Sequence, residues 1–145
     1  EQFLSPLLAA TVSNPVVFRA GTPLYPTLSG LIQAIFTTIE KIKTVISYVE
    51  EHYAQTITIE EMAVLCYFSK SHFMKFFKES MGISFVTYLN NYRLEAAANM
   101  LLATNDNVLD IANACGFDNL SYFNRSFKRK HGITPGKYRP QRILC

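Results

Sequence analysis

The chain has little of several features on which other classes of protein depend. Its 145 residues include three Cys, six Gly, six Pro and no Trp. No apolar run reaches the roughly 20 uncharged residues of a membrane span, and no basic segment leads into an apolar signal sequence. The odd set Cys66, Cys115 and Cys145 contains no CxxC pair, which argues against a disulfide framework or a zinc site. We therefore expect a reduced, cytoplasmic protein that does not associate with membranes.

Side chains that carry chemistry also lack the spacing of a catalytic centre. His52, His72 and His131 lie far apart, with no second ligand at a metal-binding spacing. The sequence has no glycine-rich phosphate loop, no supported Ser/His/Asp set and no paired carboxylates in a plausible cleft. We predict no enzymatic activity, no metal and no other cofactor. Because the first residue is Glu1 rather than Met, we also expect the chain to be a piece of a longer protein.

Charge is segregated along the sequence. The formal net charge is only +3, yet residues 119–145 contain no Asp or Glu. The basic residues in this stretch are Arg125, Lys128, Arg129, Lys130, Lys137, Arg139 and Arg142. Such a concentration of positive charge favours a polymeric anion as the partner.

The stretch GFDNLSYFNRSFKRKHGI, residues 116–133, separates apolar and basic residues onto two faces of one short helix. At about 3.6 residues per turn, Leu120, Phe123 and Phe127 share one side. Ser121, Arg125 and Lys128 or Arg129 share the other. We predict that the first side packs and the second faces a partner.

Periodicity and capping signals predict an all-α fold of about seven helices. Residues 1–40 hold four of the six prolines and three charged residues, so we interpret them as a linker or the tail of an upstream domain, with one possible amphipathic helix over residues 28–39. The expected helices then span about residues 41–53, 59–66, 69–79, 84–102, 108–115, 119–130 and 135–139. A capping box at Thr58 and Glu61, an N-cap at Ser69, and the glycines Gly82 and Gly132 support these boundaries. In the long helix, one buried stripe is expected, formed by Phe85, Leu89, Tyr92, Ala96 and Met100.

The two halves of this helical region repeat each other at an offset of 49 to 50 residues. The matched positions of the first half are Ala63, Cys66, Phe68, Phe73, Phe77, Lys78, Gly82, Ile83 and Tyr88, and those of the second are Ala112, Cys115, Phe117, Phe123, Phe127, Lys128, Gly132, Ile133 and Tyr138. Two copies of a short helix, a tight turn and a second helix indicate a pair of helix-turn-helix units. Cys66 and Cys115 occupy equivalent core positions. Because Tyr67 stands where the second copy has Gly116, the backbone of the first turn is expected to differ.

The helix over residues 84–102 joins the two units. Nineteen residues at about 1.5 Å each give roughly 28 Å, close to the roughly 34 Å between successive major grooves on one face of DNA. A single chain could thus place one helix from each unit in two adjacent grooves.

The segments FSKSHFMKFFKESMGISFVTYLNNYRLEAA and DIANACGFDNLSYFNRSFKRKHGITPGKYR resemble the C-terminal DNA-binding domain of AraC/XylS-type transcription regulators, over about residues 41–140. The second segment carries the most specific part of the resemblance. It implies a first helix-turn-helix unit over residues 41–83, a linking helix over 84–102 and a second unit over 103–145. It further implies a bacterial-type regulator that binds double-stranded promoter DNA and activates transcription by RNA polymerase. A small-molecule effector would act through a separate, upstream sensing domain.

The resemblance also implies which residues read DNA. Base contacts are expected from the outer faces of the two second helices, at Ser71, His72, Met74, Lys75, Ser121, Tyr122, Asn124 and Arg125. Candidates for phosphate contacts are Lys70, Lys78, Lys128, Lys130, Lys137 and Arg139.

Two alternatives remain open at this point. The basic face could meet an acidic protein, which would make the chain a helical interaction module. Alternatively, the chain could belong to a DNA-repair alkyl-transfer protein, because some of these carry a domain of this type beside reactive cysteines. RNA binding is disfavoured, because no open sheet with stacking aromatic residues is predicted.

Overall fold

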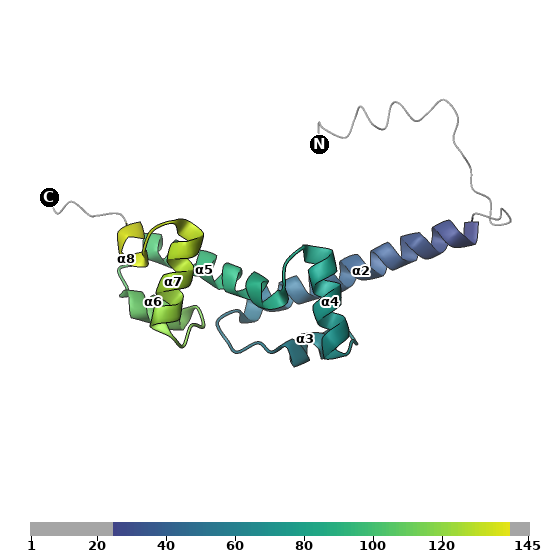
Figure 1. Cartoon of the computed structure of the whole chain (residues 1–145), viewed down its shortest axis with the longest axis horizontal. Coiled ribbons are helices and arrows are strands. Elements are labelled where there is room, and N and C mark those ends of the chain that lie inside the picture. Colours follow the sequence, from purple (N-terminus) through teal and green to yellow (C-terminus); the bar gives the residue numbers. More distant parts are fainter. Residues whose placement is uncertain (1–24, 140–145) are drawn as a thin grey trace, which may run out of the picture. The chain divides into compact units, whose positions relative to one another are not determined.

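The computed structural model describes residues 25–139, which form seven α-helices and no β-strand. The helices are α2 (Tyr25–His52), α3 (Ile59–Leu65), α4 (Lys70–Met81), α5 (Phe85–Ala103), α6 (Val108–Ala114), α7 (Leu120–His131) and α8 (Pro135–Tyr138) (Figure 1). The expected all-α class is confirmed, and from α3 onward every predicted boundary lies within two residues of the observed one. None of these helices is long and apolar enough to cross a membrane.

Capping residues set these boundaries as the sequence predicts. At the start of α3 the Thr58 hydroxyl accepts from the Glu61 backbone N–H at 3.2 Å, and the Glu61 carboxylate accepts from the Thr58 backbone N–H at 2.7 Å. This reciprocal pair satisfies two backbone donors that the first turn leaves free. Gly82 and Gly132 end α4 and α7 with φ values of 75° and 81°, a conformation that glycine adopts without steric cost.

The helices predicted over residues 28–39 and 41–53 are one continuous helix, α2, so the expected start of a separate helix at residue 41 is wrong. No Gly or Pro occurs between Leu31 and His52, and nothing else in that stretch ends a helix. Residues 1–24 lie outside the described residues, and the interpretation of residues 1–40 as a linker or tail stays a prediction. The chain divides between Thr38 and Ile39 into two units.

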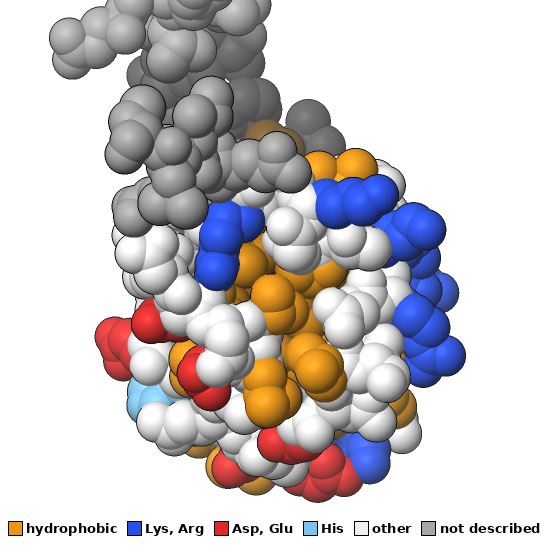
Figure 2. Space-filling model, turned by 90° about the vertical axis from the view of Figure 1, so that its left-hand side faces the viewer, with side chains coloured by type: hydrophobic (Ala, Val, Ile, Leu, Met, Phe, Trp, Pro, Cys, Tyr) orange, Lys and Arg blue, Asp and Glu red, His pale blue; other side chains and the backbone are white. Residues whose placement is uncertain are grey.

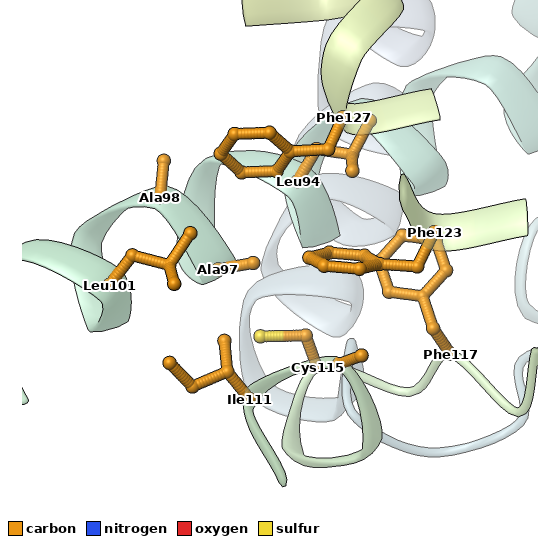
Figure 3. Packing of buried hydrophobic residues seen from close by; sticks show 10 residues of the cluster. Leu94, Ala97, Ala98, Leu101, Ile111, Cys115, Phe117, Phe123 and Phe127 are labelled. Carbon is orange, nitrogen blue, oxygen red and sulfur yellow. The ribbon is translucent and has the colours of Figure 1, made fainter. Parts of the chain in front are cut away.

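Two apolar cores form within the compact part Ile39–Cys145, which contains both helix-turn-helix units. The buried residues of the first core are Val45, Val49, Met62, Ala63, Cys66, Phe73, Phe77, Phe85 and Leu89. Those of the second core are Leu94, Ala97, Ala98, Leu101, Ile111, Ala112, Cys115, Phe117, Phe123 and Phe127, most of which are shown in Figure 3. Each core belongs to one helix-turn-helix unit, so each unit has its own hydrophobic support.

Helix α5 contributes to both cores, with different faces. Its first two turns bury Phe85 and Leu89 in the first core, whereas Leu94, Ala97 and Leu101 lie in the second. The single stripe expected along α5 is therefore wrong in its second half, where Ala96 and Met100 are only partly buried. The buried face turns because the two units pack against different sides of the same helix.

Candidate nucleic-acid interface

The two turns between paired helices have the same backbone design. After α3, the Phe68 N–H donates to the Ala63 carbonyl at 2.8 Å; after α6, the Phe117 N–H donates to the Ala112 carbonyl at 3.0 Å. Tyr67, inside the first turn, has a φ of 58°, and Gly116, at the equivalent position of the second turn, has a φ of 79°. The expected difference in backbone shape is therefore wrong, because Tyr67 adopts the left-handed conformation that Gly116 adopts more easily.

An N-cap hydrogen bond and a buried phenylalanine pair fix the start and the orientation of the second helix in each unit. Ser69 accepts from the His72 N–H at 3.3 Å, and Asn119 accepts from the Tyr122 N–H at 2.8 Å. In α4 and α7 the phenylalanine pairs Phe73/Phe77 and Phe123/Phe127 are fully buried, four residues apart on one side of each helix. The opposite side of each helix is left for a partner.

The four base-contact candidates of α4 lie on that exposed side. Ser71, His72, Met74 and Lys75 are all exposed. The His72 ring packs on Phe68, with 4.1 Å between ring centroids, which limits its freedom to reach outward. Lys75 lies 3.9 Å from Glu79 one turn later, an exposed pair that contributes little and that a phosphate or base could replace.

The candidates of α7 are placed similarly, with two differences. Ser121 and Arg125 are exposed, while Asn124 is half-buried. The Tyr122 hydroxyl accepts a hydrogen bond from the Asn90 side chain of α5 at 3.1 Å, which holds this ring in place. Arg125 is thus a long, exposed hydrogen-bond donor on the outer face of α7.

The six phosphate-contact candidates divide into two groups. Lys78, Lys128 and Lys137 are exposed, and Lys70 is exposed in an ion pair with Glu60. Lys130 instead donates to the Asn91 carbonyl at 3.1 Å and lies 3.0 Å from Glu95, with only 23% of its side chain exposed. Arg139 donates to the Asp106 carbonyl. Lys130 thus attaches α7 to α5, and Arg139 attaches the end of α8 to the connection before α6.

The charge of the interface is uneven. Helix α4 contains Glu79, whereas α7 contains no acidic residue and has Lys128, Arg129, Lys130 and His131 in its last turn. Figure 2 views the end of the molecule that carries α6, α7 and α8, where most Lys and Arg side chains gather along one edge and Asp and Glu lie on the opposite side and at the bottom. This separation suits binding to a polyanion.

Two comparisons identify the arrangement. Residues 62–141, more than half of the chain, match the sequence profile of a family described as a helix-turn-helix domain. The structure of a transcriptional regulator from Chromobacterium violaceum, described as containing an AraC-type DNA-binding domain, superposes with a TM-score of 0.66 at 25% identity, covering 72% of this chain and 94% of that one. The chain belongs to the AraC-type helix-turn-helix family.

Two further relatives of this AraC-type chain bear on its role. The DNA-binding domain of AdpA, described as a global transcriptional factor and solved with a target DNA, matches at 26% identity with a TM-score of 0.62, over 66% of this chain and 86% of that one. The bifunctional transcriptional activator and DNA repair enzyme AdaA of Bacillus subtilis (strain 168) is 34% identical over 69% of this chain. This chain spans about half of AdaA, 47% of its length. The matched region of this chain is an AraC-type helix-turn-helix domain.

The similarity to a repair enzyme directs attention to the cysteines. Cys66 and Cys115 are buried in the two cores, and the Cys115 thiol donates to the Met100 sulfur at 3.7 Å. Burial raises the pKa of Cys66, and it raises the pKa of Cys115 to about 11. A buried thiol with a raised pKa is a poor nucleophile. Cys145 lies outside the described residues, and within 25–139 no group of three or more His, Cys, Asp or Glu is arranged to hold a metal.

Sequence reasoning missed the residues that join the two units. Arg93 in the middle of α5 donates to the Tyr53 carbonyl and to the Gln55 carbonyl, both at 2.7 Å. These partners lie about 40 residues earlier in the chain, in the connection between α2 and α3. No periodicity or spacing signals a side chain that binds backbone carbonyls so far away; only the half-buried position of Arg93 in the structure reveals it.

Proposed function

We propose that this chain binds double-stranded promoter DNA in a sequence-specific manner, with α4 and α7 in adjacent major grooves. The observation that carries the proposal is the attachment of two matching helix-turn-helix units to one helix. Helix α5 has 19 residues, about 28 Å at 1.5 Å per residue, which is close to the groove repeat of about 34 Å. Both second helices have an exposed polar face and a buried aromatic one.

Arg125 and Lys75 are the proposed principal readers. A guanidinium can donate two hydrogen bonds to O6 and N7 of guanine, while an ammonium group reaches the same atoms as a point charge. Ser71, Ser121 and Asn124 offer shorter polar contacts, and Met74 offers an apolar one to a thymine methyl. His72 packs on Phe68 and Tyr122 is held by Asn90, so these two residues would contribute contacts at the edge of the site.

Lys70, Lys78, Lys128 and Lys137 are the proposed phosphate contacts, since their side chains are exposed. Lys130 and Arg139 remain candidates, but a phosphate would have to compete with the bonds they make to α5 and to the Asp106 carbonyl. The protein would act in the cytoplasm, activate transcription through RNA polymerase and respond to an effector through a sensing domain outside this segment.

In the experiment, the chain selects duplex DNA from a random pool, and its affinity for the selected sequence is then measured by electrophoretic mobility shift. We expect binding that survives a large excess of random DNA and weakens by about 10³–10⁵ between 50 and 200 mM salt if six or more phosphates are contacted. A helical module for acidic proteins would select no common sequence. Binding that is equal for selected and random DNA would overturn the proposal.

The enzymatic alternative has its own test. Incubation of the chain with methylated DNA followed by mass spectrometry of the protein should show no transferred methyl group, because the described thiols are buried and their pKa values are raised. A mass gain of one methyl group on any cysteine would assign repair chemistry to this segment.

A further inference from the structure

Three segments meet between the two helix-turn-helix units. They are the connection after α2, the middle of α5 and the turn after α6. Arg93 of α5 donates from Nε to the Tyr53 carbonyl and from Nη2 to the Gln55 carbonyl, both at 2.7 Å. This guanidinium therefore ties the first unit's connection to the helix that carries the second unit.

Gly116 brings the second unit's turn against the same place. A Cβ at this position would lie 2.9 Å from the Ala54 carbonyl oxygen, 3.0 Å from that of Tyr53 and 3.1 Å from the Arg93 guanidinium carbon. Such approaches are too close for any side chain, so the turn rests directly on the backbone of the first unit. Gly82 and Gly132, which also have positive φ, have nothing within 4 Å of the same point.

The Tyr53 side chain completes the junction. It packs against both hydrophobic cores, and its ring lies 5.3 Å from that of Tyr92. We call Tyr53, Ala54, Gln55, Arg93 and Gly116 the inter-unit junction. It is a second connection between the units, in addition to the continuous backbone of α5. A single helix between two bodies permits twisting, whereas a second point of attachment opposes it.

Arginine suits this role for a geometric reason. Its planar group donates in two fixed directions at once, so it specifies both the distance and the angle between the two carbonyls and α5. Burial lowers the pKa of Arg93, while the nearby Asp118 carboxylate opposes that shift. Lysine at this position would keep a positive charge but would lose the rigid fork.

We propose that Arg93 is a positioning residue that sets the separation and rotation of α4 relative to α7. It thereby sets the base-pair spacing that the protein accepts between its two DNA boxes, the short sequences that α4 and α7 would each contact. The inference rests on the proposed function, because it requires two boxes to be read together. On B-form DNA one extra base pair turns the second box by about 34–36° and shifts it by about 3.4 Å. A stiff junction cannot follow that change, whereas a loosened one can.

The test uses the duplex that this chain selects from a random pool, together with duplexes carrying one or two base pairs inserted or deleted between the boxes and duplexes retaining one box. The variants are Arg93→Lys and Arg93→Gln. Lys43→Met, an exposed change on α2, is the control, since the Lys43 side chain is 67% exposed and its ammonium group pairs with Glu40 in the preceding turn. Affinity and thermal unfolding are measured for each protein.

For the unchanged chain and for Lys43→Met, we expect at least about a tenfold preference for the selected spacing over a one-base-pair change, because the second contact is lost when the geometry does not match. For both Arg93 variants this preference should fall to about twofold or threefold. Affinity for a single box should stay within about twofold, which also shows that the units remain folded. The loss of spacing preference distinguishes positioning from a contribution to stability alone.

Two results would overturn the inference while leaving the proposed function intact: an unchanged spacing preference in both Arg93 variants, or a loss of single-box affinity equal to the loss on two boxes. If the unchanged chain binds one box as tightly as two, the two-groove function itself fails, and that outcome is visible before any variant is made.

Discussion

The two helix-turn-helix units share a backbone plan but differ in charge and in surroundings. In the first unit, Lys70 and Lys75 of α4 lie beside Glu60 and Glu79, and the turn residue Tyr67 is 93% exposed. In the second unit α7 contains no acidic residue, and the turn residue Gly116 is pressed against the first unit's backbone. Two units with the same fold thus differ in the charge of their second helices and in the exposure of their turns.

This difference distinguishes what the helix-turn-helix fold requires of a turn residue from what packing at the inter-unit junction requires. Both turns have a positive φ and the same hydrogen bond, so the turn itself tolerates Tyr as well as Gly. Only the second turn must lack a side chain, because the inter-unit junction leaves no room for one. Likewise, both second helices need their buried phenylalanines, but only α7 lacks an acidic residue of its own and ends in a run of basic residues.

The largest expected effects come from the separate cores. Phe73→Ala and Phe123→Ala should each lower the free energy of unfolding by about 3–5 kcal/mol, because each removes a fully buried ring from one core. Chemical denaturation measures the free energy of unfolding, and native-state amide hydrogen exchange shows which unit opens. We expect exchange to accelerate first in the unit that carries the change. Equal acceleration in both units would show that α5 couples the cores into one cooperative block.

The turns provide the next comparison. Gly116→Ala should lower the free energy of unfolding by about 2–4 kcal/mol, since it combines left-handed strain with overpacking. Gly132→Ala, whose Cβ meets open space, should cost only the strain, about 1–2 kcal/mol. Tyr67→Asn should raise stability by less than about 1 kcal/mol, because Asn tolerates a positive φ better. Equal costs at Gly116 and Gly132 in thermal unfolding would contradict the close approach at the junction.

The readers of the two units should also differ. Arg125→Ala should cost about 1–3 kcal/mol of binding free energy and relax preference at one base pair of the selected DNA. Lys75→Ala should cost less, because a point charge specifies a base less strictly than a two-pronged donor. Lys128→Ala should weaken selected and random DNA alike. Competition binding with single-base variants decides this, and equal loss on selected and random DNA for Arg125→Ala would refute its role in reading bases.

The smallest expected effect concerns pH. The pKa of Cys115 rises from 9.0 to about 11 on folding, so the neutral thiol stabilises the folded state. That contribution is complete below pH 9 and is lost as the pH rises towards 11. Cys115→Ala should therefore flatten part of the decline in unfolding free energy over this window. Cys66→Ala is the matched control in the first core, with the same direction of shift. A decline that is identical in the unchanged chain and both variants would show that other groups, such as Tyr53, account for it.

The local parts of this structure could be predicted from sequence, and the long-range parts could not. Capping residues such as Thr58, Ser69 and Gly132 act within one turn of the chain, so they located the helix ends closely. The face that α5 buries depends on where the second unit docks, and no local pattern encodes that. Lys130 was grouped with exposed lysines on charge alone, although in the fold its ammonium group lies against α5.

The proposed function depends on one chain binding two major grooves about one turn apart. Methylation interference on the selected duplex tests it most directly, because methyl groups on guanine N7 lie in the major groove where Arg125 and Lys75 would bind. We expect two clusters of interfering guanines on one face of the DNA, about 10 base pairs apart. Arg125→Ala should erase one cluster and Lys75→Ala the other. A single cluster that both variants weaken together would contradict binding in two grooves.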